Sequence, residues 1–127
     1  MFHRDVGKFH KGKMAYLSGQ AAEQSVERQY LDRGYALLGR RWRGTSGEID
    51  LVFGLNAGFV FVEVKKSRSF DQAALRISRA QRLRIFATAT EFVARQPNGQ
   101  LSQMRFDVAL CNAVGEIRLL ENALYCD

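Results

Sequence analysis

Two short segments of the chain combine acidic and basic side chains in an order suited to phosphodiester chemistry. Asp50 lies in the run Gly-Glu-Ile-Asp-Leu, and Glu63 and Lys65 lie in the run Phe-Val-Glu-Val-Lys. Because side chains alternate between the two faces of a strand, Glu63 and Lys65 share one face of theirs. If the two segments pair as neighbouring strands, we expect Asp50, Glu63 and Lys65 on the same side of the sheet.

Such a group could bind a divalent cation and activate water. Carboxylates supply the oxygen ligands that Mg²⁺ prefers, and a bound cation lowers the pKa of its water. A neighbouring lysine can orient or deprotonate that water, or stabilise the charge that develops on phosphate. Without a counter-charge, Asp50 and Glu63 would repel each other. A metal, Lys65 or both must therefore balance them.

A simpler interpretation fits the same spacing. A Glu and a Lys two positions apart on a strand often form a weak, solvent-exposed ion pair. However, Glu63 and Lys65 directly follow the run Phe-Val-Phe-Val in the same strand, and that run is typical of a buried strand. Charges in such a strand are costly unless they are paired or bind a metal, so the run favours a functional group.

The elements that would position these residues follow from hydrophobic periodicity and turn residues. We expect helices over 18–33 and 71–95 and strands over 35–42, 48–53, 59–65, 104–111 and 115–120. The short, Gly-containing segment 54–58 favours an antiparallel hairpin. Alternation would place Ile49, Leu51 and Phe53 on one face of the second strand. The order αβββαββ predicts an α/β fold with a mixed central sheet flanked by helices.

Length and charge bound the remaining choices. The 127 residues, with 19 Lys+Arg against 13 Asp+Glu, suit a single domain over 1–127 with a net charge of +6. We interpret 1–13 as a flexible N-terminal arm. The basic balance favours a polyanionic partner, most often nucleic acid or an anionic membrane. No apolar run is long enough to span a membrane and no secretory signal precedes the domain, so we expect a cytoplasmic protein.

Two basic clusters are candidate phosphate contacts. Arg40, Arg41 and Arg43 surround Trp42, which could stack on a base or lie in the core. A second set at three-residue spacing would form a stripe on the long helix and could follow a duplex backbone; it comprises Arg76, Arg79 and Arg82. Exposed strand ends and helices also carry such charges without any ligand.

Five other side chains have simpler interpretations. His3 and His10 lie in the predicted arm and are expected to be solvent-exposed. Asp107 is expected to pair with a nearby arginine inside the sheet. Cys111 and Cys126 lack the spacing of a zinc site.

Several of these segments together resemble one known family. Gly47–Leu51, Val60–Lys65, Arg105–Val108 and Glu121–Ala123 occur in the order found in the YraN-like family of bacterial proteins. The resemblance spans about 19–123. That family is classed with the PD-(D/E)XK nuclease superfamily, which includes restriction endonucleases and Holliday-junction resolvases. The resemblance implies a restriction-endonuclease-like core, a mixed central sheet flanked by helices.

The resemblance also implies roles for individual residues. Asp50 matches the motif aspartate, a metal ligand, whereas Glu63 and Lys65 match the E-x-K pair of ligand and catalytic lysine. Glu23 matches a first-helix glutamate that can complete a site for Mg²⁺ or Mn²⁺. Val64 would offer its backbone carbonyl.

The chain departs from the family pattern in two places. Gly19-Gln20 stands where an acidic residue usually follows the glycine, and Glu27 could substitute for Glu23. Gln81 stands where the long helix commonly carries a lysine. A phosphate contact made by that lysine would pass to Arg79, Arg82 or Gln81.

Three hypotheses follow. The first is a metal-dependent endonuclease acting on nucleic acid, with DNA favoured over RNA and branched DNA among the candidate substrates. A single site cuts one strand, so cutting both would require a homodimer or two encounters. The second is a non-catalytic nucleic-acid-binding module in a repair, recombination or ribosome-associated complex. The third is an interaction protein whose carboxylates form structural ion pairs.

Overall fold

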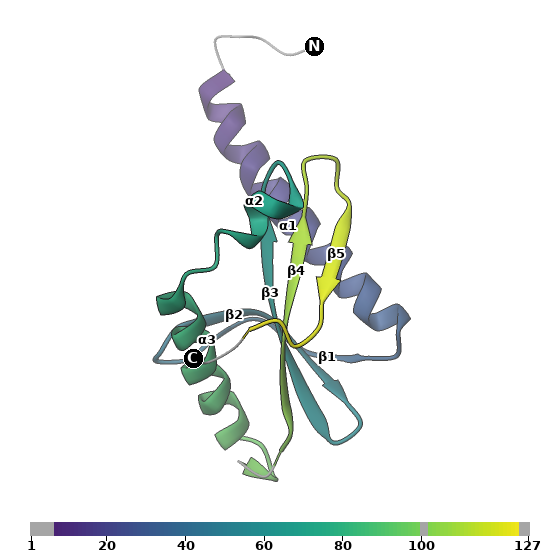
Figure 1. Ribbon diagram of the computed structural model, residues 1–127, viewed down its shortest axis with the longest axis vertical. Helices are drawn as coiled ribbons and strands as arrows, with labels where there is room; N and C mark the ends of the chain where they lie inside the picture. Colours follow the sequence, from purple (N-terminus) through teal and green to yellow (C-terminus); the bar gives the residue numbers. More distant parts are fainter. Residues whose placement is uncertain (1–6, 100–101, 125–127) are drawn as a thin grey trace.

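The computed structural model describes residues 7–99 and 102–124, with side chains from residue 19 onward. Helices and strands alternate along the chain much as the sequence predicts (Figure 1). The elements are α1 (Gly7–Asp32), β1 (Ala36–Arg43), β2 (Glu48–Leu55), β3 (Gly58–Lys66), α2 (Phe70–Ala74), α3 (Arg79–Ala94), β4 (Met104–Cys111) and β5 (Ile117–Leu120).

The strands form one mixed sheet in the order β1-β2-β3-β4-β5. Neighbouring strands are antiparallel except β3 and β4, which run parallel and are joined through α2 and α3. A parallel pair needs such a crossover, because a tight turn can join only antiparallel neighbours. The architecture confirms the predicted mixed α/β fold and is consistent with a restriction-endonuclease-like core.

Helices cover both faces of the sheet (Figure 1). On one face, Val26 and Tyr30 of α1 pack with Val62 of β3. On the other face, Phe92 of α3 packs with Phe61 of β3. Adjacent residues of β3 thus face opposite helices, as strand geometry requires. A strand covered on both faces explains the nearly continuous apolar run that the sequence shows here.

Residues of α2, α3, β4 and the C-terminal segment form a third core cluster. Ala73, Ile85, Val108 and Leu124 are buried together there. Among the described residues, the longest helices are too polar or too short to cross a membrane.

Two predicted helix boundaries were wrong. Helix α1 begins at Gly7, so 7–13, expected to be part of an arm, are helical, while 1–6 lie outside the described residues. The long helix predicted over 71–95 is interrupted between α2 and α3. The break occurs because Ser78 is extended and its hydroxyl accepts a hydrogen bond from the Gln81 N–H, which starts a new helix.

The expected alternation along β2 was also wrong at one point. Leu51 and Phe53 pack toward α1, but Ile49 packs with the cluster beneath α3. Across the ladder, Arg41 lies between the pairs Arg40–Leu51 and Trp42–Ile49, and its φ of 46° is left-handed. A left-handed residue turns the chain out of regular pleating. The irregularity falls beside Asp50.

Candidate active site

Asp50 and Glu63 meet where β2 and β3 cease to pair. The last paired residues are Leu51 and Val62, so Asp50 and Glu63 stand one step beyond them. The Val64 N–H donates a 2.8 Å hydrogen bond to Oδ2 of Asp50. The predicted convergence of these two carboxylates is therefore present in the structure.

The electrostatics of this pair are unfavourable for two negative charges. The pKa of Asp50 is raised to about 7, first by burial and then by the charge and hydrogen-bonding proximity of Glu63. The Val64 N–H and Lys65 act in the opposite direction. At neutral pH, Asp50 therefore holds a proton part of the time, and a cation placed between the carboxylates would release it.

Two donors hold Glu63 on the α3 side of the sheet. Lys65 Nζ lies 3.0 Å from Oε2 of Glu63, and Gln81 Nε2 donates to the same oxygen at 2.6 Å. Glu63 is 7% exposed, and the Lys65 side chain is 18% exposed. Gln81 thus contacts the Glu63 carboxylate directly.

Glu23 faces this region from α1 but has a different partner. Its carboxylate accepts hydrogen bonds of 3.2 and 3.1 Å from Nε and Nη2 of Arg41. Burial raises the pKa of Glu23, opposed by Arg41 and reinforced by the charge of Asp50. Glu27, the predicted substitute, accepts two hydrogen bonds from Arg40. Within the described part of the chain, no three Asp, Glu, His or Cys side chains gather closely enough to hold a metal.

The first predicted basic cluster is largely neutralised by these pairings. Arg40 pairs with Glu27, Arg41 with Glu23, and Arg43 with Glu48 at 3.0 Å. Trp42 packs edge-on against Phe92, with ring centroids 5.2 Å apart. These residues would have to exchange partners before contacting a phosphate or a base.

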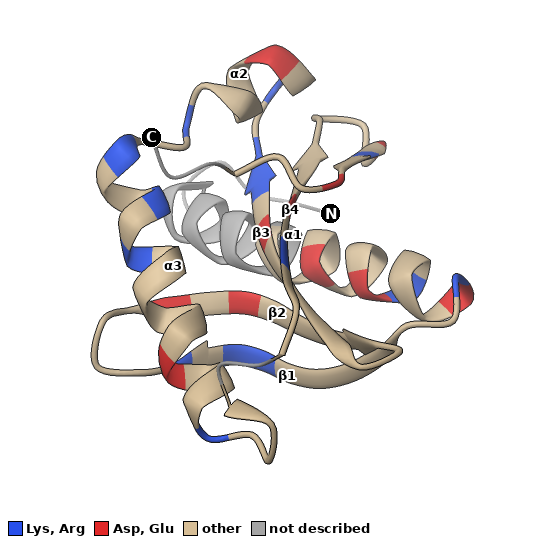
Figure 2. Cartoon of the chain, turned by 60° about the horizontal axis from the view of Figure 1, so that its bottom comes forward, with Lys and Arg blue, Asp and Glu red and all other residues tan. Residues whose placement is uncertain are grey.

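The second predicted basic cluster is not one helical stripe, because the chain breaks between α2 and α3. Arg76 lies in the link between the two helices, residues 75–78, and donates a 3.0 Å hydrogen bond to the backbone oxygen of Lys66. Arg79 is exposed at the start of α3 and has no ion pair with any described residue. Arg82 is half-buried on α3. Figure 2 shows Lys and Arg gathered on the upper half of α3 and acidic residues on β2 and α1.

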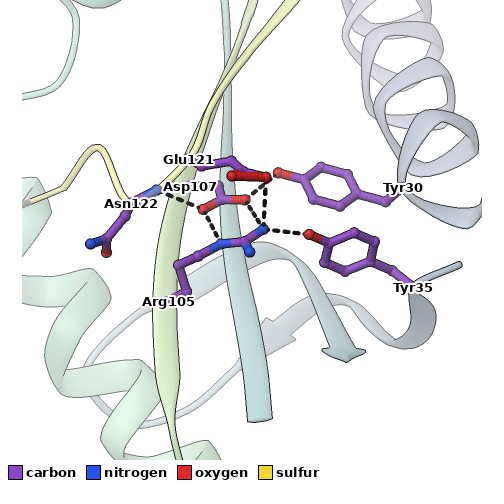
Figure 3. A network of polar contacts seen from close by, with 6 residues as sticks. All are labelled: Tyr30, Tyr35, Arg105, Asp107, Glu121 and Asn122. Atoms are coloured by element: carbon purple, nitrogen blue, oxygen red, sulfur yellow. Dashed lines mark hydrogen bonds and ion pairs between the residues drawn. The ribbon is translucent and has the colours of Figure 1, made fainter. Parts of the chain in front are cut away.

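A second buried carboxylate lies on β4 (Figure 3). Asp107 is fully buried and accepts hydrogen bonds from Tyr30 Oη at 2.7 Å and from Arg105 Nε at 2.9 Å. The Asn122 N–H donates a further bond of 2.9 Å. The predicted pairing of Asp107 with a nearby arginine is confirmed, whereas the contacts from Tyr30 and Asn122 were not anticipated, since they join segments far apart in sequence.

Glu91 is another position that sequence reasoning missed. Its carboxylate accepts hydrogen bonds from the backbone N–H groups of Thr45 and Ser46, each at 2.8 Å. These bonds lower its pKa to about 2. These hydrogen bonds attach the β1–β2 turn to α3. They join residues 45 and 46 positions apart, so no local sequence pattern predicts them. His3, His10 and Cys126 lie outside the described side chains, and Cys111 is a free, buried thiol.

Comparisons with known proteins place the chain in a family. The model for the uncharacterised protein family UPF0102 matches residues 22–111. The chain belongs to the UPF0102 family. A UPF0102 protein from Roseobacter denitrificans is 57% identical over 117 residues, which cover 92% of this chain and 91% of that protein.

Further UPF0102 relatives come from Cereibacter sphaeroides and Ruegeria pomeroyi. The Cereibacter sphaeroides protein is 50% identical, and the match covers 88% of this chain and 96% of that protein. The Ruegeria pomeroyi protein is also 50% identical, and the match covers 89% of this chain and 92% of that protein. The resemblance to the YraN-like family is thereby confirmed. The UPF0102 match includes both carboxylate segments and β4.

Proposed function

We propose that this UPF0102 protein is a metal-dependent phosphodiesterase acting on nucleic acid. The observation that carries the proposal is the carboxylate pair of Asp50 and Glu63 with Lys65 beside it. Asp50 has a pKa raised to about 7, and Lys65 Nζ lies 3.0 Å from the Glu63 carboxylate. Perturbed carboxylates beside a lysine are typical of catalytic sites.

The donor set suits Mg²⁺ or Mn²⁺. Both carboxylates present oxygen, which hard divalent cations prefer, and they lie close enough for Glu63 to raise the pKa of Asp50. Asp50 and Glu63 would hold the ion. Glu23 would join them only after leaving Arg41, to which it is bound by two hydrogen bonds.

A bound cation would supply charge neutralisation at phosphate and a more acidic water. Lys65 would orient or deprotonate that water, or stabilise negative charge on the phosphate. Gln81 keeps Glu63 in position through its 2.6 Å hydrogen bond. It cannot replace the positive charge of a lysine, so phosphate contact at this end of α3 falls to Arg79 or Arg82.

The substrate class follows from charge. A net charge of +6 and arginines near the crossover favour a polyanion. We propose DNA rather than RNA as the substrate. We also propose that the protein recognises backbone and shape rather than sequence, because arginine contacts to phosphate carry no base information. The cytoplasm remains the predicted compartment.

The test offers branched, single-stranded and duplex DNA, and RNA, to the purified chain with Mg²⁺, Mn²⁺ or a chelator. Cleavage that requires a divalent cation and disappears in Asp50→Asn and Lys65→Gln is the expected result. Glu48→Gln is the matched control, since Glu48 lies on the same strand but pairs with Arg43. Cleavage that survives Asp50→Asn would refute the proposal.

Two observations favour a second candidate, a non-catalytic nucleic-acid-binding module. Glu23 is paired with Arg41, and no three potential ligands gather among the described residues. A binding module would bind nucleic acid in a salt-sensitive way, unaffected by Asp50→Asn, and would cleave none of the substrates.

A further inference from the structure

Leu75 stands out among the apolar side chains of the described surface. Its side chain is 84% exposed, whereas Leu31, Leu38, Leu83 and Met104 are 40–47% exposed. Only Val114, at 80%, is comparable among the described large apolar residues. An isolated apolar residue on a surface is ordinary, so its surroundings must show whether Leu75 has a role.

The first relevant feature is that Leu75 projects from an ordered link. Its N–H donates to the Asp71 oxygen at 3.2 Å, at the end of α2. Ser69 caps α2 and Ser78 caps α3, each through its hydroxyl. Arg76 fastens the link to the end of β3 by donating to the Lys66 oxygen at 3.0 Å. The side chain is therefore presented on a fixed backbone.

The second feature is proximity to the carboxylate pair. Two hydrogen bonds attach this part of the crossover to β3. Arg76, in the link, donates to the Lys66 oxygen, and Gln81, in the first turn of α3, donates to Glu63. Leu75 immediately precedes the first of these two anchors. A polymer whose phosphate lies at Asp50 and Glu63 would therefore pass close to the link.

The third feature is charge. Between Ser67 and Arg79 the sequence holds three arginines and one acidic residue, Asp71. Arg68 and Arg79 are exposed and make no side-chain ion pair with the described residues. Val114, in contrast, is followed by Gly115 and Glu116, with no cation within three residues of it. An apolar side chain between cations suits nucleic acid, whose phosphates would engage arginine while the apolar tip meets the bases.

We propose that Leu75 is an apolar wedge that enters a base step where a DNA duplex opens into single strands. Apolar side chains that insert between bases must unstack them, so they favour sites where stacking is already broken. This inference deepens the proposed function and rests on it, because it takes the carboxylate pair as the place where phosphate binds.

The experiment uses the full-length chain carrying Asp50→Asn, so that no strand is cut. The probes are a forked DNA and a fully paired duplex, each with 2-aminopurine at the same position, and the fluorophore brightens when it is unstacked. The expected result is tighter binding to the fork and a rise in emission. In Leu75→Ala the preference for the fork should fall about tenfold, as expected for losing one buried apolar side chain.

Two control variants sharpen the test. Leu75→Met should keep the preference because it retains an apolar tip, and Val114→Ala should keep it although Val114 is equally exposed. Equal fork preference in Leu75→Ala and the parent would overturn the wedge while leaving the proposed function intact. Self-association that Leu75→Ala abolishes, without a change in DNA binding, would overturn it in favour of a protein contact.

The outcomes also separate this inference from the proposed function. If Leu75→Ala loses fork preference but the chain with native Asp50 never cleaves DNA, the wedge stands and the nuclease assignment fails. If neither probe binds at low salt, both fail.

Discussion

Asp50 and Asp107 are aspartates of the same sheet in opposite electrostatic situations. Asp107 is fully buried and receives donors from α1, its own strand and the segment after β5, including the cationic Arg105 (Figure 3). Asp50 receives one backbone N–H and faces Glu63, and its pKa rises to about 7.

The difference distinguishes a structural carboxylate from a candidate functional one. A buried charge is tolerated when its hydrogen bonds and counter-charge are complete, and Asp107 meets that condition. Burial raises the pKa of Tyr30 most, and the hydrogen bond to Asp107 and its charge raise it further. Asp50 lacks a cation of its own, because Lys65 is paired with Glu63. A proton relieves the charge of Asp50 at neutral pH, and a bound cation is what the proposed function would place there.

The largest predicted effect comes from breaking the complete network. Asp107→Ala removes the acceptor for Tyr30, Arg105 and Asn122 and leaves a cation and a buried hydroxyl without their partner. The expected loss is about 3–5 kcal/mol in the free energy of unfolding. Urea denaturation of the purified chain measures it. A loss below about 1 kcal/mol would mean that the network is not what fixes β4 against α1.

Lys65→Gln tests the chemical side of the comparison. It removes the charge beside Glu63 but leaves the sheet intact. If cleavage occurs, the rate should fall about 10²-fold or more. The unfolding free energy should also fall, because the buried Glu63 then keeps Gln81 but no cation as its partner. Single-turnover kinetics on the best substrate measure the rate. Lys66→Gln, on the next position of β3, is the control and should retain most of the rate.

Asp50→Asn should stabilise the protein when no divalent cation is present. The folded-state pKa is raised, so the stability contributed by Asp50 is full below its ordinary pKa and is lost as the pH rises through about 7. The asparagine variant avoids that loss, so its advantage should grow by about 2–3 kcal/mol between pH 5 and pH 8. Denaturation in chelator at several pH values measures it. A variant that is less stable at pH 8 would contradict the electrostatic account.

The smallest effect is expected at Glu91, a half-buried carboxylate with several hydrogen bonds. Hydrogen bonds from Thr45 and Ser46 lower its pKa to about 2, so its stabilisation is present above the ordinary pKa and lost as the pH falls toward 2. Glu91→Gln should lower the melting temperature modestly at pH 7 and less at pH 3. A difference independent of pH would point to packing instead.

Much of the fold could be predicted from the sequence, because β3 combines an apolar run with a pair of charged residues. Its apolar residues predict a buried strand, and Glu63 and Lys65 predict a site on it. The break between α2 and α3 was missed because the spacing of apolar and basic residues continues across Ser78. The hydroxyl of Ser78 accepts a hydrogen bond from the Gln81 N–H and thereby starts a new helix.

The candidate site was predicted in part for a similar reason. Strand pairing brings Asp50 beside Glu63, and alternation along β3 puts Lys65 on the Glu63 face, with its Nζ 3.0 Å from the carboxylate. The pairing of Glu23 with Arg41 depends on the left-handed φ of Arg41 and on how α1 lies against β1. Neither feature can be inferred from local spacing. The sequence therefore predicted a phosphate contact for Arg41 and gave no sign of its hydrogen bonds to Glu23.

Titration with Mn²⁺ tests the central claim most directly. Calorimetry at pH 8 should find a binding site in the native chain and in Glu48→Gln, and no such site in Asp50→Asn. At pH 6 the affinity should be weaker, because protonated Asp50 must lose its proton before it can bind the ion. Binding of equal affinity in the native chain and Asp50→Asn would contradict the account.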